Sequence, residues 1–283
     1  MERHGLHRLV VAALFAAMLA MAADAAPMRR ADTGLNAIPV DVELIIAVDV
    51  SYSMDPDEQA LQRQGYVRAL RSKEFLTALH EGVNGKIALT YVEWAGASDQ
   101  RILVPWRLID GPEAAAAIAA EIAQAPYRRA SRTSISGALT FARPLFDRSG
   151  YRGLRRVIDV SGDGANNAGA PVAPTRDAVI ADHITINGLP IMLKRPTPGT
   201  MDIEHLDVYY EDCVIGGPGA FVVPIHDRDQ FIDATRTKLI LEVAGRQPPA
   251  RVIPASSEKP RISCLIGETR WQDRWGGRGF DFR

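Results

Sequence analysis

The stretch VELIIAVDVSYSMDPDE, from Val42 to Glu58, decides the fold of this chain. Its first seven residues form a run of mainly branched apolar side chains, which is typical of a strand buried on both faces of a parallel sheet. Its end carries the signals of a helix N-terminus: Asp55 can cap, Pro56 suits the first helical position, and Glu58 completes a capping-box pattern. A buried strand followed by a short polar loop and a capped helix indicates an α/β fold.

The rest of the chain continues this alternation at the spacing of right-handed βαβ units. Strands are expected over residues 86–95, 101–109, 154–162, 184–191 and 217–225, and helices over residues 57–80, 111–125, 134–146, 174–182 and 227–244. Residues 206–216 fit either a short helix or an extended segment. Residues 86–109 read as a hairpin, and Pro105 favours an edge position for its second strand. We therefore predict a doubly wound α/β fold, with a mostly parallel sheet, helices on both faces and one antiparallel edge strand.

Composition and charge exclude several classes of protein. The chain has 283 residues, of which 47% are apolar, so it is neither a disordered protein nor a small disulfide scaffold. Its 33 basic and 34 acidic residues give a net charge of -1. Non-specific binding to nucleic acid needs a basic excess, so no nucleic-acid partner is expected.

The N-terminus has the pattern of a secretory signal peptide over residues 1–25. Arg3 and Arg8 lie in a basic region, an apolar run follows from Leu9 to Ala23, and Ala23 to Ala25 fit a small-x-small cleavage site. The apolar run is short for a membrane span, and the absence of a cysteine at the cut argues against a lipoprotein. We expect a periplasmic or secreted product with no membrane span after cleavage, and a polar lead-in over residues 26–41.

Two cysteines, Cys213 and Cys264, lie far apart and belong to no C-x-x-C pair. In an oxidising compartment two cysteines pair more often than they stay free, so a disulfide is the favoured interpretation, although buried free thiols also fit the sequence. Residues 245–283 form a C-terminal extension rich in Pro, Arg, Gly and aromatic residues. We expect it to be partly docked, through Cys264, or disordered.

Oxygen-bearing side chains follow the predicted central strands. Asp49, Ser51 and Ser53 come directly after the first strand, in D-V-S-Y-S, and Asp163 follows another strand, in S-G-D-G. Thr133 lies where a predicted helix begins. Ligands of an open parallel sheet bind outside the carboxyl ends of its strands, so these five residues are candidate ligands of one cation. Oxygen donors with few charges suit Mg²⁺ or Mn²⁺.

These motifs resemble the metal-ion-dependent adhesion site (MIDAS) of the von Willebrand factor type A (vWA) domain, over residues 42–244. The family's D-x-S-x-S, threonine and later aspartate match Asp49, Ser51, Ser53, Thr133 and Asp163 in order. The resemblance implies that the three hydroxyls touch the metal directly and that the two aspartates act partly through water. The stretches INGLPI and VIGGPGAF look like an exported, uncharacterised bacterial branch. Residues 190–219 depart from the family as an irregular insertion.

The resemblance implies a protein-binding or adhesion module rather than an enzyme. An incomplete shell of ligands would let the metal capture an acidic group, presented by a protein or another envelope ligand. One alternative is a metal-dependent hydrolase of phosphate or ester substrates, with Asp159 as a conceivable base. Another is a structural subunit whose site stays unfilled. The sequence does not fix the oligomeric state.

Overall fold

The computed structural model describes residues 36–197, 200–245 and 260–275, and the predicted signal peptide lies outside them. One five-stranded sheet has the order β3-β2-β1-β4-β5. Its strands are β1 (Ile38–Asp49), β2 (Ile87–Trp94), β3 (Gln100–Ile109), β4 (Tyr151–Gly162) and β5 (Ile184–Pro190). Only β3 pairs antiparallel, and it lies at an edge. The predicted α/β class, the hairpin and the edge position of Pro105 are therefore confirmed.

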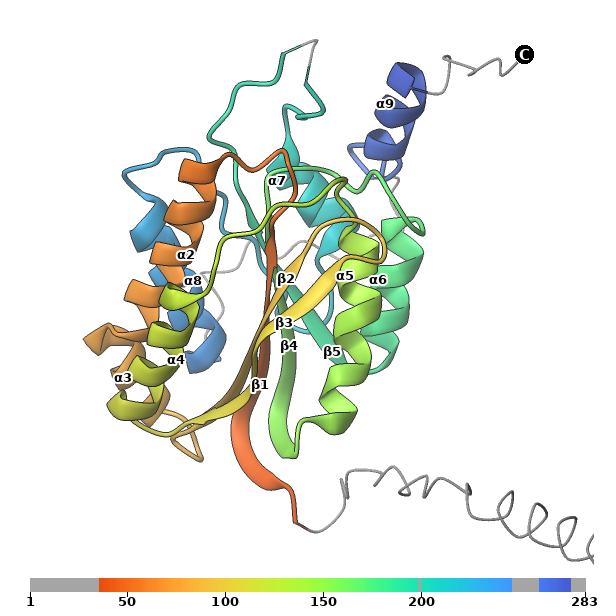
Figure 1. The fold of residues 1–283 in the computed structure, drawn as a ribbon. Coiled ribbons are helices and arrows are strands. Elements are labelled where there is room, and N and C mark those ends of the chain that lie inside the picture. The colour runs from red at the N-terminus through yellow and green to blue at the C-terminus, as the bar shows by residue number, and fades with distance from the viewer. Residues whose placement is uncertain (1–35, 198–199, 246–259, 276–283) are drawn as a thin grey trace, which may run out of the picture. The chain divides into compact units, whose positions relative to one another are not determined.

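Helices cover both faces of this sheet (Figure 1). On one face lie α2 (Pro56–Leu70), α3 (Lys73–His80), α4 (Pro112–Gln124) and α8 (Phe231–Ala244). On the other lie α5 (Ile135–Ala142), α6 (Val172–Ala181) and the short α7 (Leu206–Tyr209). Further helical elements are two irregular turns, η2 (Arg143–Arg148) and η3 (Tyr210–Val214), and α9 (Ile266–Trp275). In the described ranges no helix is both long and apolar enough to cross a bilayer.

The first strand lies at the centre of the core. Leu44, Ile46 and Val48 face the cluster under α2 and α8, whereas Ile45 and Ala47 face the cluster under α5. Side chains alternate across a strand, so a strand with helices on both faces must be apolar at nearly every position. β1 also starts at Ile38 and so includes part of the predicted lead-in.

The expected single helix over residues 57–80 is wrong, because the chain forms two helices there. Ser72 separates α2 from α3: its hydroxyl donates to the Ala69 carbonyl at 2.8 Å and accepts from the Phe75 N–H at 3.1 Å. This side chain satisfies orphan groups at both helix ends. The apolar period continues across the break, so hydrophobic spacing alone does not reveal it. The start at Asp55 has the predicted capping box.

The expected strand over residues 217–225 does not form as a strand. Val222 and Ile225 make only isolated bridges, to Gly188 and Ile191. The segment follows β5 without a regular ladder, because Gly217 and Gly219 adopt positive φ and Pro218 and Pro224 offer no N–H. Residues 206–214, where helix and extended structure were both open, are helical.

An ion cluster is buried between α8 and the sheet. The Lys238 Nζ lies 2.6 Å from Asp159 Oδ1 and 2.6 Å from Glu242 Oε1. The Tyr66 hydroxyl donates to Asp159 at 3.3 Å, and the Asn187 amide donates to Glu242 at 2.7 Å. All three charged side chains are almost completely buried. This cluster fixes α8 against β4 and β5.

Replacing Lys238 by methionine should destabilise the fold strongly. The variant leaves two buried carboxylates without their cation, which costs about 3–5 kcal/mol when one partner of a buried ion pair is removed. Urea unfolding followed by circular dichroism measures the change. Arg236→Met is the matched control, since Arg236 lies on the exposed side of the same helix and pairs only at the surface with Asp233. We expect it to change stability by less than about 0.5 kcal/mol; equal losses in both variants would contradict the assignment.

Candidate metal centre

The candidate site lies where β1 and β4 end, at the carboxyl edge of the sheet. In the D-V-S-Y-S loop, residues 49–53, the Asp49 carboxylate accepts the Ser51 backbone N–H at 2.7 Å. This local bond turns the chain so that the Ser51 and Ser53 hydroxyls come within 2.7 Å of each other. The Ser53 hydroxyl in turn donates to Asp163 Oδ1 at 2.6 Å. Four of the five predicted ligands therefore form one connected group.

Thr133 reaches the same edge through backbone pairing. The Tyr52 N–H donates to the Ala130 carbonyl at 2.9 Å, and the Ala130 N–H donates to the Val50 carbonyl at 3.0 Å. This short parallel pairing holds the segment that contains Thr133 beside the D-V-S-Y-S loop. A Cβ built on Gly164, the residue after Asp163, would lie 3.7 Å from the Thr133 hydroxyl. Thr133 thus borders the group formed by the other four residues.

Two asparagines hold this arrangement together. The Asn167 side-chain carbonyl accepts the Thr133 N–H at 3.0 Å, and the Asn167 N–H donates to the Thr133 carbonyl at 2.8 Å. The Asn166 side chain accepts the Ser136 N–H at 3.0 Å, at the start of α5. Both asparagines are buried, whereas Tyr52 is 61% exposed. The sequence placed this Gly-Ala-Asn-Asn stretch at the mouth of the site; in the structure its asparagines brace the Thr133 segment from inside.

Sequence reasoning missed two members of the site, Glu58 and Lys194. The Glu58 carboxylate is buried below the loop, where it also accepts the Asp55 N–H at 2.9 Å. Lys194 comes from the insertion and contacts Glu58, the Ser53 carbonyl and Asp163. The capping-box pattern explained Glu58 without reference to the site. No local signal marks Lys194, which follows β5 in an irregular segment.

Burial and like charge disfavour ionisation of the two aspartates. Burial, together with the Asp163 carboxylate, raises the pKa of Asp49 well above its usual value, and hydrogen bonds from Ser51 offset this only in part. Burial also raises the pKa of Asp163 to about 6, although the Ser53 hydroxyl and Lys194 act in the opposite direction. The pair therefore lacks compensating positive charge.

The residues present fit a hard divalent cation. Asp49 Oδ2 is buried and has no hydrogen bond of normal geometry in the described part of the chain, although the Asp163 backbone N–H lowers the pKa of Asp49. Asp49, Asp163 and Glu58 are three carboxylates, and Lys194 is the cation in contact with two of them. When all three are ionised, two negative charges remain in excess. Hydroxyl and carboxylate oxygens are the donors that Mg²⁺ and Mn²⁺ prefer.

Asp159, the conceivable base of a hydrolase, does not join this group. It lies within β4, completely buried, and pairs with Lys238 on the face covered by α8. A general base must lie within hydrogen-bond reach of the proton that it removes. The site thus lacks the acid–base residue that the hydrolase alternative had named.

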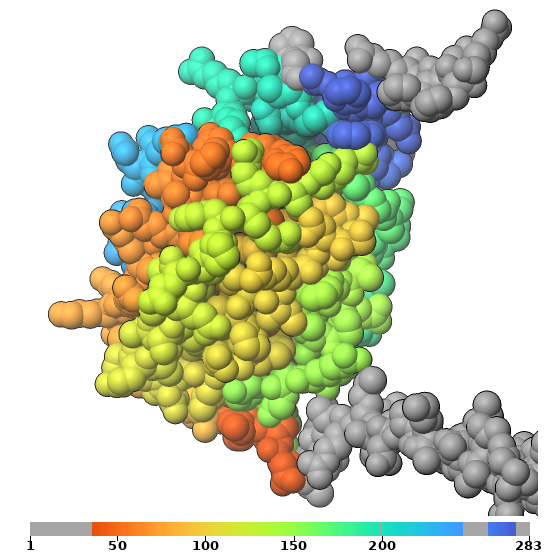
Figure 2. Space-filling view, in the orientation of Figure 1, coloured from red at the N-terminus to blue at the C-terminus, as the bar shows by residue number. Residues whose placement is uncertain are grey.

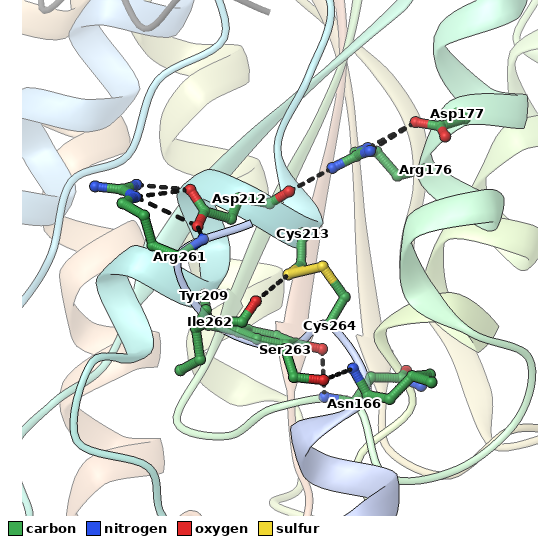
Figure 3. The surroundings of a disulfide bond; sticks show 11 residues. Asn166, Arg176, Asp177, Tyr209, Asp212, Cys213, Arg261, Ile262, Ser263 and Cys264 are labelled. Carbon is green, nitrogen blue, oxygen red and sulfur yellow. Dashed lines mark hydrogen bonds and ion pairs between the residues drawn. A yellow bond between two sulfur atoms is a disulfide. The ribbon is translucent and has the colours of Figure 1, made fainter. Parts of the chain in front are cut away.

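The C-terminal segment is attached beside this edge by a disulfide. Cys213 and Cys264 are bonded, which confirms the favoured interpretation of the two cysteines (Figure 3). The Arg261 guanidinium pairs with Asp212 next to the bond, at 2.7 Å. From α9, the Glu268 carboxylate accepts the Asn166 side-chain N–H at 2.7 Å, and the Arg132 guanidinium stacks over the Trp271 ring at 3.5 Å. The first part of the extension is therefore docked, as expected.

Comparison with protein-family models places residues 39–247 in a family described as protein of unknown function (DUF1194). The match spans most of the chain, so the chain belongs to this family. No curated protein matches it in sequence. Because the family's description names no function, the comparison identifies the lineage and leaves the activity to be argued from the site.

Solved structures with a similar fold are vWA proteins and adhesins. Proximal thread matrix protein 1 from the mussel byssus, with a zinc-occupied MIDAS motif, is 17% identical over 74% of this chain and 49% of its own, with a TM-score of 0.50. The pilus adhesin SpaC of Lactobacillus rhamnosus GG is 12% identical over 74% and 30%, with a TM-score of 0.53. A von Willebrand factor type A protein of Catenulispora acidiphila is 15% identical over 72% and 43%, with a TM-score of 0.50. The chain thus spans less than half the length of each, and the likeness establishes a vWA fold.

Asp163 should make the metal-free protein lose stability as the pH rises. Its pKa is about 6 in the folded chain and about 3.9 in an unfolded one, so the folded state binds the proton more tightly between these values. Stability from this group is complete below about pH 4 and declines up to about pH 6, by at most about 3 kcal/mol. In chelator, Asp163→Asn should therefore be more stable than the wild type at pH 7 and similar to it at pH 4.

Denaturant unfolding at several pH values tests this expectation, and the difference between the two proteins isolates Asp163. Asp182→Asn is a control of opposite sign, because a hydrogen bond from the Arg143 guanidinium lowers the pKa of Asp182 at the surface. That variant should lose stability relative to the wild type as the pH rises. A lower stability of Asp163→Asn at pH 7 would show that this carboxylate stabilises the metal-free fold.

Proposed function

We propose that this member of the DUF1194 family is an exported binding module that uses a divalent cation at the D-V-S-Y-S loop to capture an acidic group of a partner. The observation that supports it most directly is the undercompensated set of buried oxygens: three carboxylates contact or face one another with a single ammonium among them. A buried anionic group without sufficient positive charge is unfavourable unless a cation completes it.

Asp49, Ser51, Ser53, Thr133 and Asp163 would hold the cation, which we propose to be Mg²⁺ or Mn²⁺. The bound ion supplies an electrophilic centre for an incoming carboxylate oxygen. The protein's own residues do the rest: the Ser51 N–H orients Asp49, Ser53 orients Asp163, and Asn167 holds the Thr133 backbone. Such prior ordering lowers the entropic cost of binding.

The surroundings of the loop suit a protein partner. Tyr52 projects from the loop and is mostly exposed, and the Arg129 guanidinium lies 5.4 Å from its ring. Tyrosine and arginine are enriched in the energetically important parts of protein interfaces. An arginine beside the cation also favours an acidic partner over a basic one. The solved vWA structures named above include an adhesin, which agrees with a binding role.

Export is supported by two independent features. Residues 1–25 have the pattern of a signal peptide, and Cys213 and Cys264 form a disulfide. Disulfides persist in oxidising compartments such as the periplasm and are rare in the cytosol. We therefore place the protein in the periplasm or outside the cell.

Calorimetric titration of chelator-treated protein with MgCl₂ and MnCl₂ tests the cation site. We expect saturable binding near one ion per chain, and a loss of at least tenfold in affinity for Ser51→Ala combined with Ser53→Ala, since the variant removes two oxygen donors. Ser149→Ala is a matched control, because Ser149 is a buried serine that binds Glu43 away from this edge. Absence of binding by the wild type would overturn the proposal.

A pull-down from envelope extract tests the capture of a partner. The wild type should retain the partner in Mg²⁺ and release it in chelator, whereas the double serine variant should retain nothing under either condition. Retention that is independent of Mg²⁺ would contradict metal-mediated capture. Metal-dependent turnover of a generic phosphate or ester substrate that is lost in Asp49→Ala would instead favour the hydrolase.

A further inference from the structure

Lys194 belongs to a segment that the fold sets firmly over the candidate site. This rim segment, residues 191–197 and 200–205, follows β5 within the insertion. The Ile191 N–H donates to the Gly162 carbonyl at 2.9 Å, and the Met192 N–H donates to the Ile225 carbonyl at 2.8 Å. These bonds fix the start of the segment two residues before Lys194. In the space-filling view, the rim segment (teal) rises beside the D-V-S-Y-S loop (orange) (Figure 2).

The Lys194 side chain returns from the rim segment into the acidic group. Its ammonium contacts the Glu58 carboxylate and the Ser53 carbonyl oxygen, and lies 3.4 Å from Asp163 Oδ2. The side chain is 33% exposed, whereas the Glu58 and Asp163 side chains are 1% and 4% exposed. A small cavity of about 50 Å³ adjoins these groups, and Asp202 and Glu204 contribute further acidic side chains to its lining. The ammonium thus contacts only acceptors, one of which is a proposed ligand of the metal.

We propose that Lys194 is a tethered cation that compensates the acidic group in the metal-free protein and competes with the divalent ion for it. This inference rests on the proposed function, because it concerns the regulation of the same site. An ammonium and a divalent ion that share Asp163 repel each other, and the repulsion is strong where water is largely excluded. The ion therefore binds at the cost of the contacts of Lys194, and the rim segment sets how tightly the site holds metal.

The same arrangement links the metal to the rim. If binding of the ion weakens the hold on Lys194, then by reciprocity the hold on Lys194 weakens binding of the ion by the same factor. Lys194 is the contact through which the rim segment reaches Ser53 and Asp163. A partner that draws the rim segment away would raise the affinity for metal, and metal would release the rim segment.

The test compares Lys194→Gln with Arg195→Gln by titration with MgCl₂. Both variants remove one positive charge from neighbouring residues, but Arg195 is exposed, so its variant controls for general electrostatics. Lys194→Gln keeps a hydrogen-bond donor and should bind Mg²⁺ about 10- to 100-fold more tightly than the wild type. Arg195→Gln should differ from the wild type by less than about threefold, because exposed charges are screened. The thermal stabilisation by Mg²⁺ should also be larger for Lys194→Gln than for the wild type.

A second measurement on the wild type needs no variant. Acylation of lysine amines, quantified by mass spectrometry, should label Lys194 at least threefold faster with saturating Mg²⁺ than in chelator. Lys73, an exposed lysine at the start of α3, should be labelled equally under both conditions.

The outcomes separate this inference from the proposed function. Equal or weaker Mg²⁺ binding by Lys194→Gln, with a wild type that binds, overturns the tether and leaves the metal site standing. Binding by Lys194→Gln alone supports the tether and shows that Lys194 blocks the wild-type site. If neither protein binds Mg²⁺ and the labelling of Lys194 does not change, both the cation site and the tether are wrong.

Discussion

The interaction on which this site depends is the repulsion between carboxylates gathered at one end of a parallel sheet. Parallel strands end at the same edge, so Asp49 after β1 and Asp163 after β4 must lie together, and the first turn of α2 adds Glu58. Burial raises the pKa of both aspartates. The fold therefore creates a place that positive charge stabilises, and Lys194 supplies only part of that charge.

The core shows how the same protein treats a buried charge that serves structure alone. Lys238 lies between Asp159 and Glu242, and Tyr66 and Asn187 bind the remaining carboxylate oxygens. A cluster satisfied in this way fixes one packing of α8 on the sheet. At the carboxyl edge, in contrast, Asp49 Oδ2 has no normal hydrogen bond in the described part of the chain. This contrast between two acidic clusters of one domain distinguishes a binding site from a structural one.

Two parts of the chain build a rim around this edge on the vWA scaffold. The rim segment brings Lys194 to the acidic group, and the Cys213–Cys264 disulfide holds the C-terminal segment beside it. Glu268 and Trp271 of α9 contact Asn166 and Arg132, which border the Thr133 segment. Both additions therefore meet residues that support the proposed ligands. A common scaffold thus acquires a particular rim, and specificity for a partner would be set there rather than in the sheet.

The sequence by itself determined the α/β class, the antiparallel edge strand and the candidate ligands, because each depends on local patterns: the apolar run before Asp49, the capping box at Glu58, and polar residues at strand ends. It placed the break at Ser72 wrongly, and gave residues 217–225 a regular strand that they do not form, because hydrophobic spacing does not record which backbone groups find partners. Only the tertiary structure decided the pairing of the cysteines and the position of Lys194. Both depend on where segments distant in the sequence meet, and no local periodicity encodes that.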